Sequence, residues 1–368
     1  MKKFQHHFNK VFPRRFGNYW KKNKSILNID SDLKKITDDF IQSKSYKFVS
    51  NYWHRLNIEN YKTLGSVGEK EAISRINRCF HTFVDLHDEW IEGAIQNLSE
   101  DKNASVNSDL FKKQKGFTHR QSIFYNYLCF LLYNNLKKFK YFKNLSDLQD
   151  KTYLGYDDPF VEIDNLKLTS DKINSLFDCE KMNKAFELNN SSSVLEIGAG
   201  SGRTSEALLT IYNDLKYVIC DIPVSLFISY KRLKAAFPKK RISLLTNVQT
   251  KEELQKAIKS NDISFIFPHQ LEDLSKKFFN LVVAIDCLHE MDKKTIKFYF
   301  DSVNELTENF YFSIWSKTVL PYSKNFFNSG ERLDFDKGDY DIPKNWKSIL
   351  KENLIFPSNF LGLGYKIK

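Results

Sequence analysis

The sequence is poor in cysteine, proline and glycine, with 5, 8 and 13 of these among 368 residues. The cysteines are odd in number and have no paired spacing, so we expect neither a disulfide framework nor a zinc site. They occur singly, at Cys79, Cys129, Cys179, Cys220 and Cys287. This usage fits a reducing compartment, and we expect a cytoplasmic protein.

Signals for membrane insertion and secretion are equally scarce. The most apolar run, Ile123 to Tyr133, has about eleven residues, whereas a helix that spans a bilayer needs about twenty. The basic start, Met1-Lys2-Lys3, leads into no apolar signal core. We therefore expect a soluble protein.

Charge is plentiful but unevenly distributed. The formal net charge is +11, and roughly 26 basic against about 16 acidic residues precede position 151. This excess is either a Lys-rich solvated surface or an attraction to an anionic acceptor or a membrane surface. No helix-turn-helix, zinc-finger or RNA-binding signature accompanies it, so we expect no nucleic-acid partner.

The most informative segment runs from Val194 to Thr204, with the sequence VLEIGAGSGRT. An apolar strand meets Glu196, three alternating glycines make a tight turn, and a helix begins at once. Strand, glycine-rich turn and helix in this order open a nucleotide-binding α/β domain. A dinucleotide fingerprint would place a glycine at position 203, which is Arg203 here.

Further apolar segments end in acids at regular intervals. Lys216 to Cys220 precedes Asp221, and Phe279 to Ile285 precedes Asp286. Segments 263–267 and 309–315 are also predicted strands, and helical stretches separate all of them. We predict a parallel sheet covered on both faces, with ligands bound beyond the carboxyl ends of its strands.

The rest of the chain is divided by composition. We predict a basic lead-in at 1–30, a mostly helical domain at 31–150, a linker that covers the cofactor or substrate at 151–190, and the α/β domain at 191–368. In the linker we predict a short hairpin around Asp164-Asn165, followed by a helix that Thr169 or Ser170 caps. Near the end we predict a polar loop over 318–340, a helix over 343–353 and a last strand over 361–368.

The Gly198-x-Gly200-x-Gly202 turn behind Glu196 resembles motif I of class I S-adenosylmethionine-dependent methyltransferases. About the last 200 residues resemble a narrower group, the sugar O-methyltransferases of bacterial polysaccharide and glycoside clusters. That match is carried by Asp221-Ile222-Pro223, by Phe267-Pro268-His269-Gln270-Leu271 and by Asp286-Cys287-Leu288-His289-Glu290-Met291. The resemblance implies a Rossmann-like, seven-stranded methyltransferase sheet behind the helical domain.

The resemblance also implies roles for individual residues toward S-adenosylmethionine. Gly198, Gly200 and Gly202 would contact its methionine part through the backbone, and Glu196 would help to hold its amino end. Asp221 would accept hydrogen bonds from the ribose hydroxyls, and Ile222 would pack on the adenine. His269 and Gln270 would lie near the adenine edge. Asp286 could bind the amino group of the cofactor, the acceptor or a metal.

Methyl transfer to a hydroxyl needs alignment and a proton acceptor. His289, three residues past the end of a strand, is the first candidate for the base, because a histidine pKa lies near neutrality. Glu290 is the alternative base and could orient His289, and Asp286 could bind the acceptor. The strand at 309–315 ends without the acids that some metal-dependent relatives carry, so we assign no metal ligands.

The predicted function is methylation of a sugar hydroxyl, in synthesis of a surface polysaccharide such as a capsule. A small aromatic or polyketide hydroxyl is an alternative acceptor, and a non-catalytic accessory protein with this fold is another alternative. The acceptor could be anionic or lipid-linked, with peripheral contact to a membrane. A helical domain of this kind often dimerises related small-molecule enzymes, so a homodimer is also open.

Overall fold

The computed structural model describes residues 16–23, 28–43, 45–67, 69–81, 111–114, 117–148, 159–248, 250–319, 332–357 and 360–368. Much of the predicted lead-in, residues 82–110 of the predicted helical domain and residues 151–158 of the predicted linker lie outside the described residues. Within the described residues, no helix combines the length and apolar character needed to cross a bilayer.

The strands are β1 (Val161–Ile163), β2 (Leu166–Leu168), β3 (Ser193–Ile197), β4 (Lys216–Cys220), β5 (Ile242–Leu244), β6 (Ile263–Ile266), β7 (Leu281–Ile285), β8 (Asn309–Trp315), β9 (Lys317–Val319), β10 (Arg332–Asp334), β11 (Trp346–Asn353) and β12 (Phe360–Ile367). The α-helices are α2 (Ser31–Gln42), α3 (Asn51–Ser66), α4 (Glu69–His81), α6 (His119–Leu136), α7 (Ser170–Phe186), α8 (Arg203–Ile211), α9 (Pro223–Ala236), α10 (Lys251–Ser260) and α11 (Lys293–Leu306). The short 3-10 helices are η1 (Ser45–Phe48), η3 (Lys140–Asn144), η4 (Ser146–Leu148), η5 (Pro268–Asp273), η6 (Leu288–Glu290) and η8 (Phe335–Lys337).

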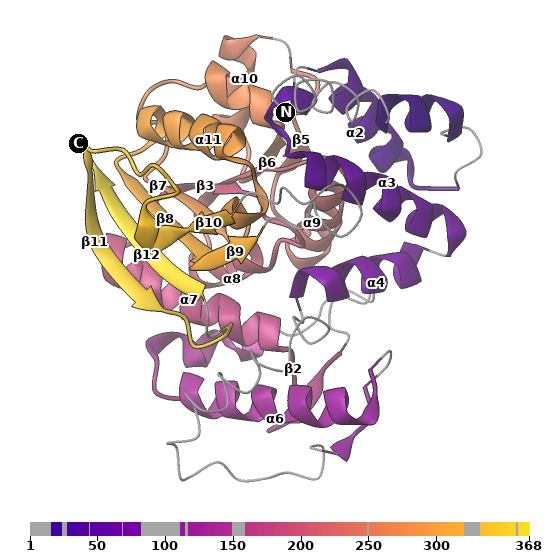
Figure 1. Cartoon of the computed structure of the whole chain (residues 1–368), viewed down its shortest axis with the longest axis vertical. Helices are drawn as coiled ribbons and strands as arrows, with labels where there is room; N and C mark the ends of the chain where they lie inside the picture. Colours follow the sequence, from indigo (N-terminus) through magenta and orange to yellow (C-terminus); the bar gives the residue numbers. More distant parts are fainter. Residues whose placement is uncertain are drawn as a thin grey trace.

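One sheet dominates the molecule, and its strand order is β11-β12-β8-β7-β3-β4-β6-β5 (Figure 1). Strands β3 to β8 pair in parallel, whereas β12 is antiparallel to both β8 and β11. The predicted α/β, Rossmann-like methyltransferase fold is confirmed. The strand order reverses between β3 and β7, so the loops after these two strands lie at the switch point where such sheets bind ligands.

The sheet has eight strands, one more than predicted. The additional strand is β5, a three-residue edge strand that pairs with β6. The helix predicted over 343–353 is wrong, because β11 occupies 346–353. Most of the β11 side chains are exposed or half-buried, so the segment has no strong hydrophobic period, and its pairing with β12 decides the conformation. The predicted loop over 318–340 is partly wrong too, because β9 and β10 form an antiparallel pair.

Two apolar cores cover the two faces of the sheet. Because strand side chains alternate between faces, Tyr217 and Ile219 of β4 join one core and Val218 joins the other. The first core contains α7, α8 and α9, and the second contains α10 and α11. The predicted hairpin and helix cap are confirmed, because β1 pairs with β2 around Asp164-Asn165 and Thr169 caps α7.

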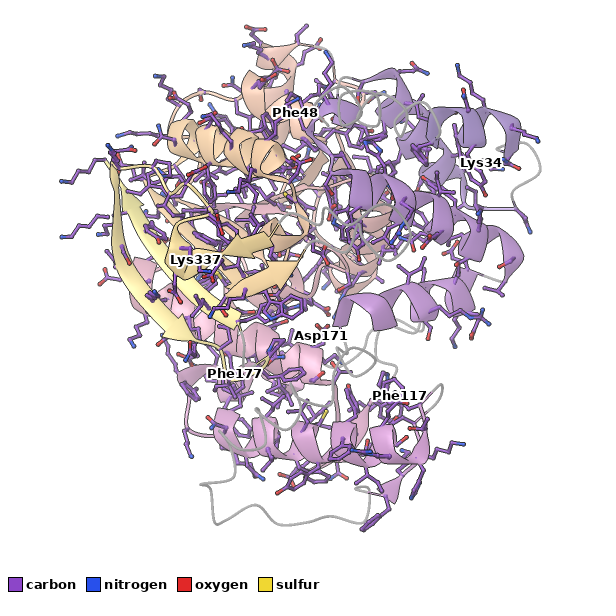
Figure 2. All side chains as sticks on the ribbon, viewed as in Figure 1. Lys34, Phe48, Phe117, Asp171, Phe177 and Lys337 are labelled. Atoms are coloured by element: carbon purple, nitrogen blue, oxygen red, sulfur yellow. The ribbon has the colours of Figure 1, made fainter. Side chains whose placement is uncertain are left out.

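The described helices between residues 16 and 81, here called the amino-terminal layer, pack beside α9 (Figure 1). Residues 16–23 are helical, so this part of the predicted lead-in is ordered, with Phe16 and Trp20 buried. Phe40 meets Phe267 edge to face at a centroid distance of 5.4 Å. Phe48, which Figure 2 labels close to α11, stacks on Phe298 of that helix with a ring-centroid distance of 3.8 Å. One core thus runs from the layer into the sheet, and the predicted domain boundaries stay predictions.

The shared core makes a prediction about stability. Phe40→Ala should lower the free energy of unfolding by about 3–5 kcal/mol, because it removes a buried ring between the amino-terminal layer and the sheet. Phe111→Ala, at a side chain that is 62% exposed, should change it by less than about 0.5 kcal/mol. Denaturant unfolding measures both. Equal effects would contradict a packed layer.

Candidate functional site

The site is built on the loops that follow β3, β4, β6 and β7, here called the crest (residues 198–202, 221–222, 267–270 and 286–290). In the first loop Gly198, Gly200 and Gly202 all have positive φ, at 69°, 58° and 79°. A Cβ on Gly198 would lie 2.8 Å from the Cβ of Cys287, so no larger residue fits. The glycine turn therefore brings bare backbone to the start of α8.

Asp221 ties the end of β4 to the glycine turn. Its Oδ2 accepts a hydrogen bond from the Gly200 N–H at 2.9 Å, and its Oδ1 accepts one from the Ile222 N–H at 2.7 Å. Burial raises the pKa of Asp221 to about 7 despite these two bonds. A carboxylate can accept about four hydrogen bonds, so this one retains capacity for a ligand.

Glu196 lies at the end of β3 and is buried beneath the turn. Its Oε2 accepts a hydrogen bond from the Tyr217 hydroxyl at 3.0 Å. Burial raises the pKa of Glu196 to about 7, against the opposing effects of Tyr217 and Arg203. Glu196 is thus joined to the neighbouring strand β4 through Tyr217, and its predicted contact with a ligand stays a prediction.

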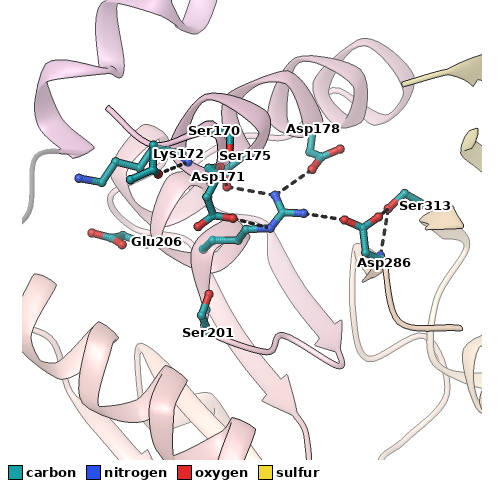
Figure 3. A network of polar contacts seen from close by, with 12 residues as sticks. Ser170, Asp171, Lys172, Ser175, Asp178, Ser201, Glu206, Asp286 and Ser313 are labelled. Carbon is teal, nitrogen blue, oxygen red and sulfur yellow. Dashed lines mark hydrogen bonds and ion pairs between the residues drawn. The ribbon is translucent and has the colours of Figure 1, made fainter. Parts of the chain in front are cut away.

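A buried guanidinium joins three structural elements at the crest. Arg203, the first residue of α8, pairs with Asp171 at 3.2 Å and Asp178 at 3.3 Å on α7, and with Asp286 at 3.0 Å after β7. Figure 3 shows the carboxylates of Asp171, Asp178 and Asp286 around the guanidinium, which dashed lines join to all three. The three carboxylates hold the pKa of Arg203 above its usual value, so its charge is permanent.

Asp286 is held in an unusual backbone conformation. Its φ is +56°, a backbone angle that residues other than glycine rarely adopt. Its Oδ1 accepts a hydrogen bond from the Ser313 hydroxyl, and its Oδ2 accepts one from Arg203. Burial raises the pKa of Asp286. Both oxygens thus have partners inside the protein, which anchor the side chain, and its predicted contacts with the cofactor's amino group and with an acceptor stay predictions.

The sequence pattern contained a signal for this network that the sequence analysis missed. Asp171, Ser175 and Asp178 repeat at i, i+4 and i+7 along α7, so they share one helix face. All three are buried, and the Ser175 hydroxyl accepts a hydrogen bond from Arg203 at 3.2 Å. A row of acidic and polar side chains on one face of a buried helix predicts that a cation packs against that face. In the local sequence, Arg203 indicates only that the dinucleotide fingerprint is broken.

The geometry at His289 argues against its predicted role as general base. Its Nδ1 accepts a hydrogen bond from the backbone N–H of Trp315 at 3.3 Å, so the proton of the neutral ring is on Nε2. The ring packs edge-on against Trp315 and Phe360. Burial lowers the pKa of His289 to about 3. A group with so low a pKa is a weak proton acceptor near neutrality.

Glu290, the alternative base, has more suitable surroundings. It is half-buried at the end of η6, and its Oε2 accepts a hydrogen bond from the indole N–H of Trp53 at 3.0 Å. Burial raises the pKa of Glu290 to about 8, and the charges of Asp286 and Asp221 add to this effect. No local pattern indicates that Trp53 contacts Glu290, because 237 residues separate the two.

The remaining predicted residues lie after β4 and β6. Ile222 is buried and directly precedes α9. The Nδ1 atom of His269 lies 2.7 Å from the hydroxyl oxygen of Ser45 in η1. Gln270 is fully buried. Its side-chain amide accepts a hydrogen bond from the Phe267 N–H and donates one to the Leu245 carbonyl. We therefore assign Gln270 to the support of the loop after β6, in place of its predicted contact with adenine.

The crest as a whole is acidic. Glu196, Asp221, Asp286 and Glu290 converge on it, and the charge of the buried Arg203 is shared among three carboxylates. Burial raises the pKa of all four acids. A nearby cation would favour their ionised forms, whereas an anion would be repelled. Among the described residues, no three His, Cys, Asp or Glu side chains are grouped to hold a metal ion.

No protein-family model matches the chain, and no curated protein matches it in sequence. Among solved structures, the chain is similar to the pyocyanin biosynthetic protein PhzM (10% identity, 51% of this chain and 53% of that chain, TM-score 0.34). It thus spans about half of PhzM. The chain is also similar to a SAM-dependent methyltransferase from Aquifex aeolicus (14% identity, 53% of this chain and 92% of that chain, TM-score 0.34).

A third similar structure is the glycopeptide N-methyltransferase MtfA complexed with sinefungin (13% identity, 53% of this chain and 87% of that chain, TM-score 0.35). At these identities and TM-scores, the three likenesses say nothing about a ligand or a reaction of this chain.

Removing the buried guanidinium should destabilise the protein strongly. Arg203→Met should lower the free energy of unfolding by about 3–5 kcal/mol, because it leaves three carboxylates buried without their cation. Arg241→Met is the matched control, because Arg241 pairs with Asp262 at an exposed position. Urea unfolding at pH 7 measures both variants. Similar losses in the two would contradict the central role of Arg203.

Proposed function

We propose that this protein is an S-adenosylmethionine-dependent O-methyltransferase that acts on a sugar hydroxyl, in the synthesis of a surface polysaccharide. The observation that carries the proposal is the acidic crest around a glycine turn of bare backbone. S-adenosylmethionine has a sulfonium and an ammonium group, so a carboxylate-rich site complements it. The pyrophosphate of a dinucleotide would be repelled by the same carboxylates.

The residues at the crest fit this cofactor. The positive φ angles of the glycine turn favour residues without a Cβ, so Gly198, Gly200 and Gly202 add no side chain to it. The Asp221 carboxylate has acceptor capacity left for a ribose diol. When bound, the cofactor supplies an electrophilic methyl group, and the protein must align the acceptor hydroxyl and remove its proton.

Glu290 is the proposed proton acceptor, in place of His289. A base works best when its pKa lies near the working pH, and the pKa of Glu290 is raised to about 8. Nearby, Trp315 is half-buried at the carboxyl end of β8. Aromatic rings of this kind stack on the apolar face of a pyranose, which supports a sugar acceptor over a purely hydrophilic one.

Cofactor binding should depend on the ionisation of Asp221. The ribose hydroxyls need an ionised acceptor, so the affinity for S-adenosylhomocysteine should rise about tenfold from pH 6 to pH 8, as Asp221 loses its proton near pH 7. Asp221→Asn should weaken binding by about 10- to 100-fold and remove this share of the pH dependence. Isothermal titration measures both effects.

Asp262→Asn is the control, because Asp262 directly precedes β6 and so lies at the opposite end of that strand from the crest. It should leave the affinity and its pH dependence unchanged. Absence of S-adenosylhomocysteine binding to the unaltered chain would contradict the proposed cofactor and favour the accessory-protein alternative.

A transfer assay with methyl-labelled S-adenosylmethionine should identify the class of acceptor that is methylated. Methyl glucoside, methyl galactoside and methyl mannoside are offered beside catechol, and a labelled pyranoside is expected. Glu290→Gln should lower its formation by about 10²- to 10⁴-fold, and the rate of the unaltered chain should rise with pH through about 8.

His289→Gln should lose far less activity than Glu290→Gln. The reverse order would return the base to His289. Label on catechol alone would favour the small aromatic acceptor, and cofactor binding without any transfer would favour the accessory protein.

A further inference from the structure

The amino-terminal layer contacts two of the loops that form the crest. Ser45 of η1 lies within hydrogen-bond distance of His269 in the loop after β6. The Ser50 hydroxyl donates to the backbone carbonyl of Glu290 at 3.2 Å. The indole N–H of Trp53 donates to the Glu290 carboxyl group at 3.0 Å. Segment 45–53 thus reaches the proposed base from a distant part of the chain.

The start of α3 holds Ser50 and Trp53 in place beside Glu290. Ser50 is the N-cap of α3, and its hydroxyl oxygen accepts a hydrogen bond from the backbone N–H of Trp53. The same hydroxyl donates to Glu290. The start of α3 is therefore joined to Glu290 twice, by Ser50 at the backbone carbonyl and by Trp53 at the carboxyl group. These two contacts restrict the orientation of the Trp53 indole.

We propose that Trp53 is a positioning residue for the Glu290 carboxyl group, so that the amino-terminal layer completes the active site. The inference rests on the proposed function, in which Glu290 accepts the proton of the acceptor hydroxyl. The indole N–H holds one carboxyl oxygen, and the other oxygen is left to face the acceptor.

The charges around Glu290 explain why a neutral donor suits this position. Asp286 and Cys287 lie beside it in the loop after β7, Asp221 faces it from the end of β4, and α3 contributes Trp53 and Ser50. A lysine or arginine in place of Trp53 would add a positive charge near the sulfonium. An indole N–H favours the ionised carboxylate without that repulsion.

The test measures the ionisation of Glu290 directly, without an acceptor. The chain is labelled with ¹³C at the glutamate carboxyl carbons, and the Glu290 resonance is assigned by its absence in Glu290→Gln. Trp53→Phe keeps an aromatic ring but loses the N–H, so the Glu290 midpoint should rise by about one pH unit, a tenfold change in the ionisation constant.

Trp20→Phe is the matched control, because the indole N–H of Trp20 donates to the Asp38 carboxyl group in the same layer. It should leave the Glu290 midpoint unchanged. An unchanged midpoint in Trp53→Phe would overturn the proposal. If Trp53→Phe does not fold, the wild-type chain still decides the matter: the Trp53 indole proton resonance must shift with the same midpoint as Glu290, and a resonance that ignores this titration overturns the proposal.

A second readout separates positioning from mere packing. With the pyranoside that is methylated best in the assay above, Trp53→Phe should lower kcat by at least tenfold while the dissociation constant of S-adenosylhomocysteine stays within about twofold of wild type. Equal losses in both would indicate a structural role. Failure of the wild-type chain to bind S-adenosylhomocysteine would instead refute the proposed function, and the Glu290 titration does not depend on that binding.

Discussion

The rest of the site depends on the pairing of one buried guanidinium with three carboxylates. Arg203 begins the helix that follows the glycine turn, and its partners lie on α7 and after β7. Removing the guanidinium would leave three carboxylates buried without their cation. The pairing therefore fixes how α7, α8 and the end of β7 meet, and it holds Asp286 in a backbone conformation that is unfavourable by itself.

A second constraint opposes the first. Four acids at the crest are kept in surroundings that disfavour their charged forms, as their raised pKa values show. Such an arrangement reduces stability unless a cation arrives, which is typical of functional sites more than of packing. The cost is offset elsewhere by two extensive apolar cores, one of which also includes the amino-terminal layer.

The strand-turn-helix unit and the acid after β4 were predictable because local sequence determines them. The positive φ angles at positions 198 and 202 favour glycine, and apolar strands that end in acids have a recognisable period. Strand β11 was not predictable, because its pattern is weak and its partner decides its conformation. His289 looked like a base by residue type, and only its buried ring and its bond from Trp315 changed that assignment.

The sequence by itself determined the fold class, the position of the glycine turn and the set of acids at strand ends, because each follows from short-range pattern and backbone geometry. Tertiary structure alone decided which of these groups are ionised, which have partners and which face one another. Arg203 meets Asp286 across 83 residues and Trp53 meets Glu290 across 237. Burial and contacts at such separations depend on the packing of the whole chain, and no local pattern encodes them.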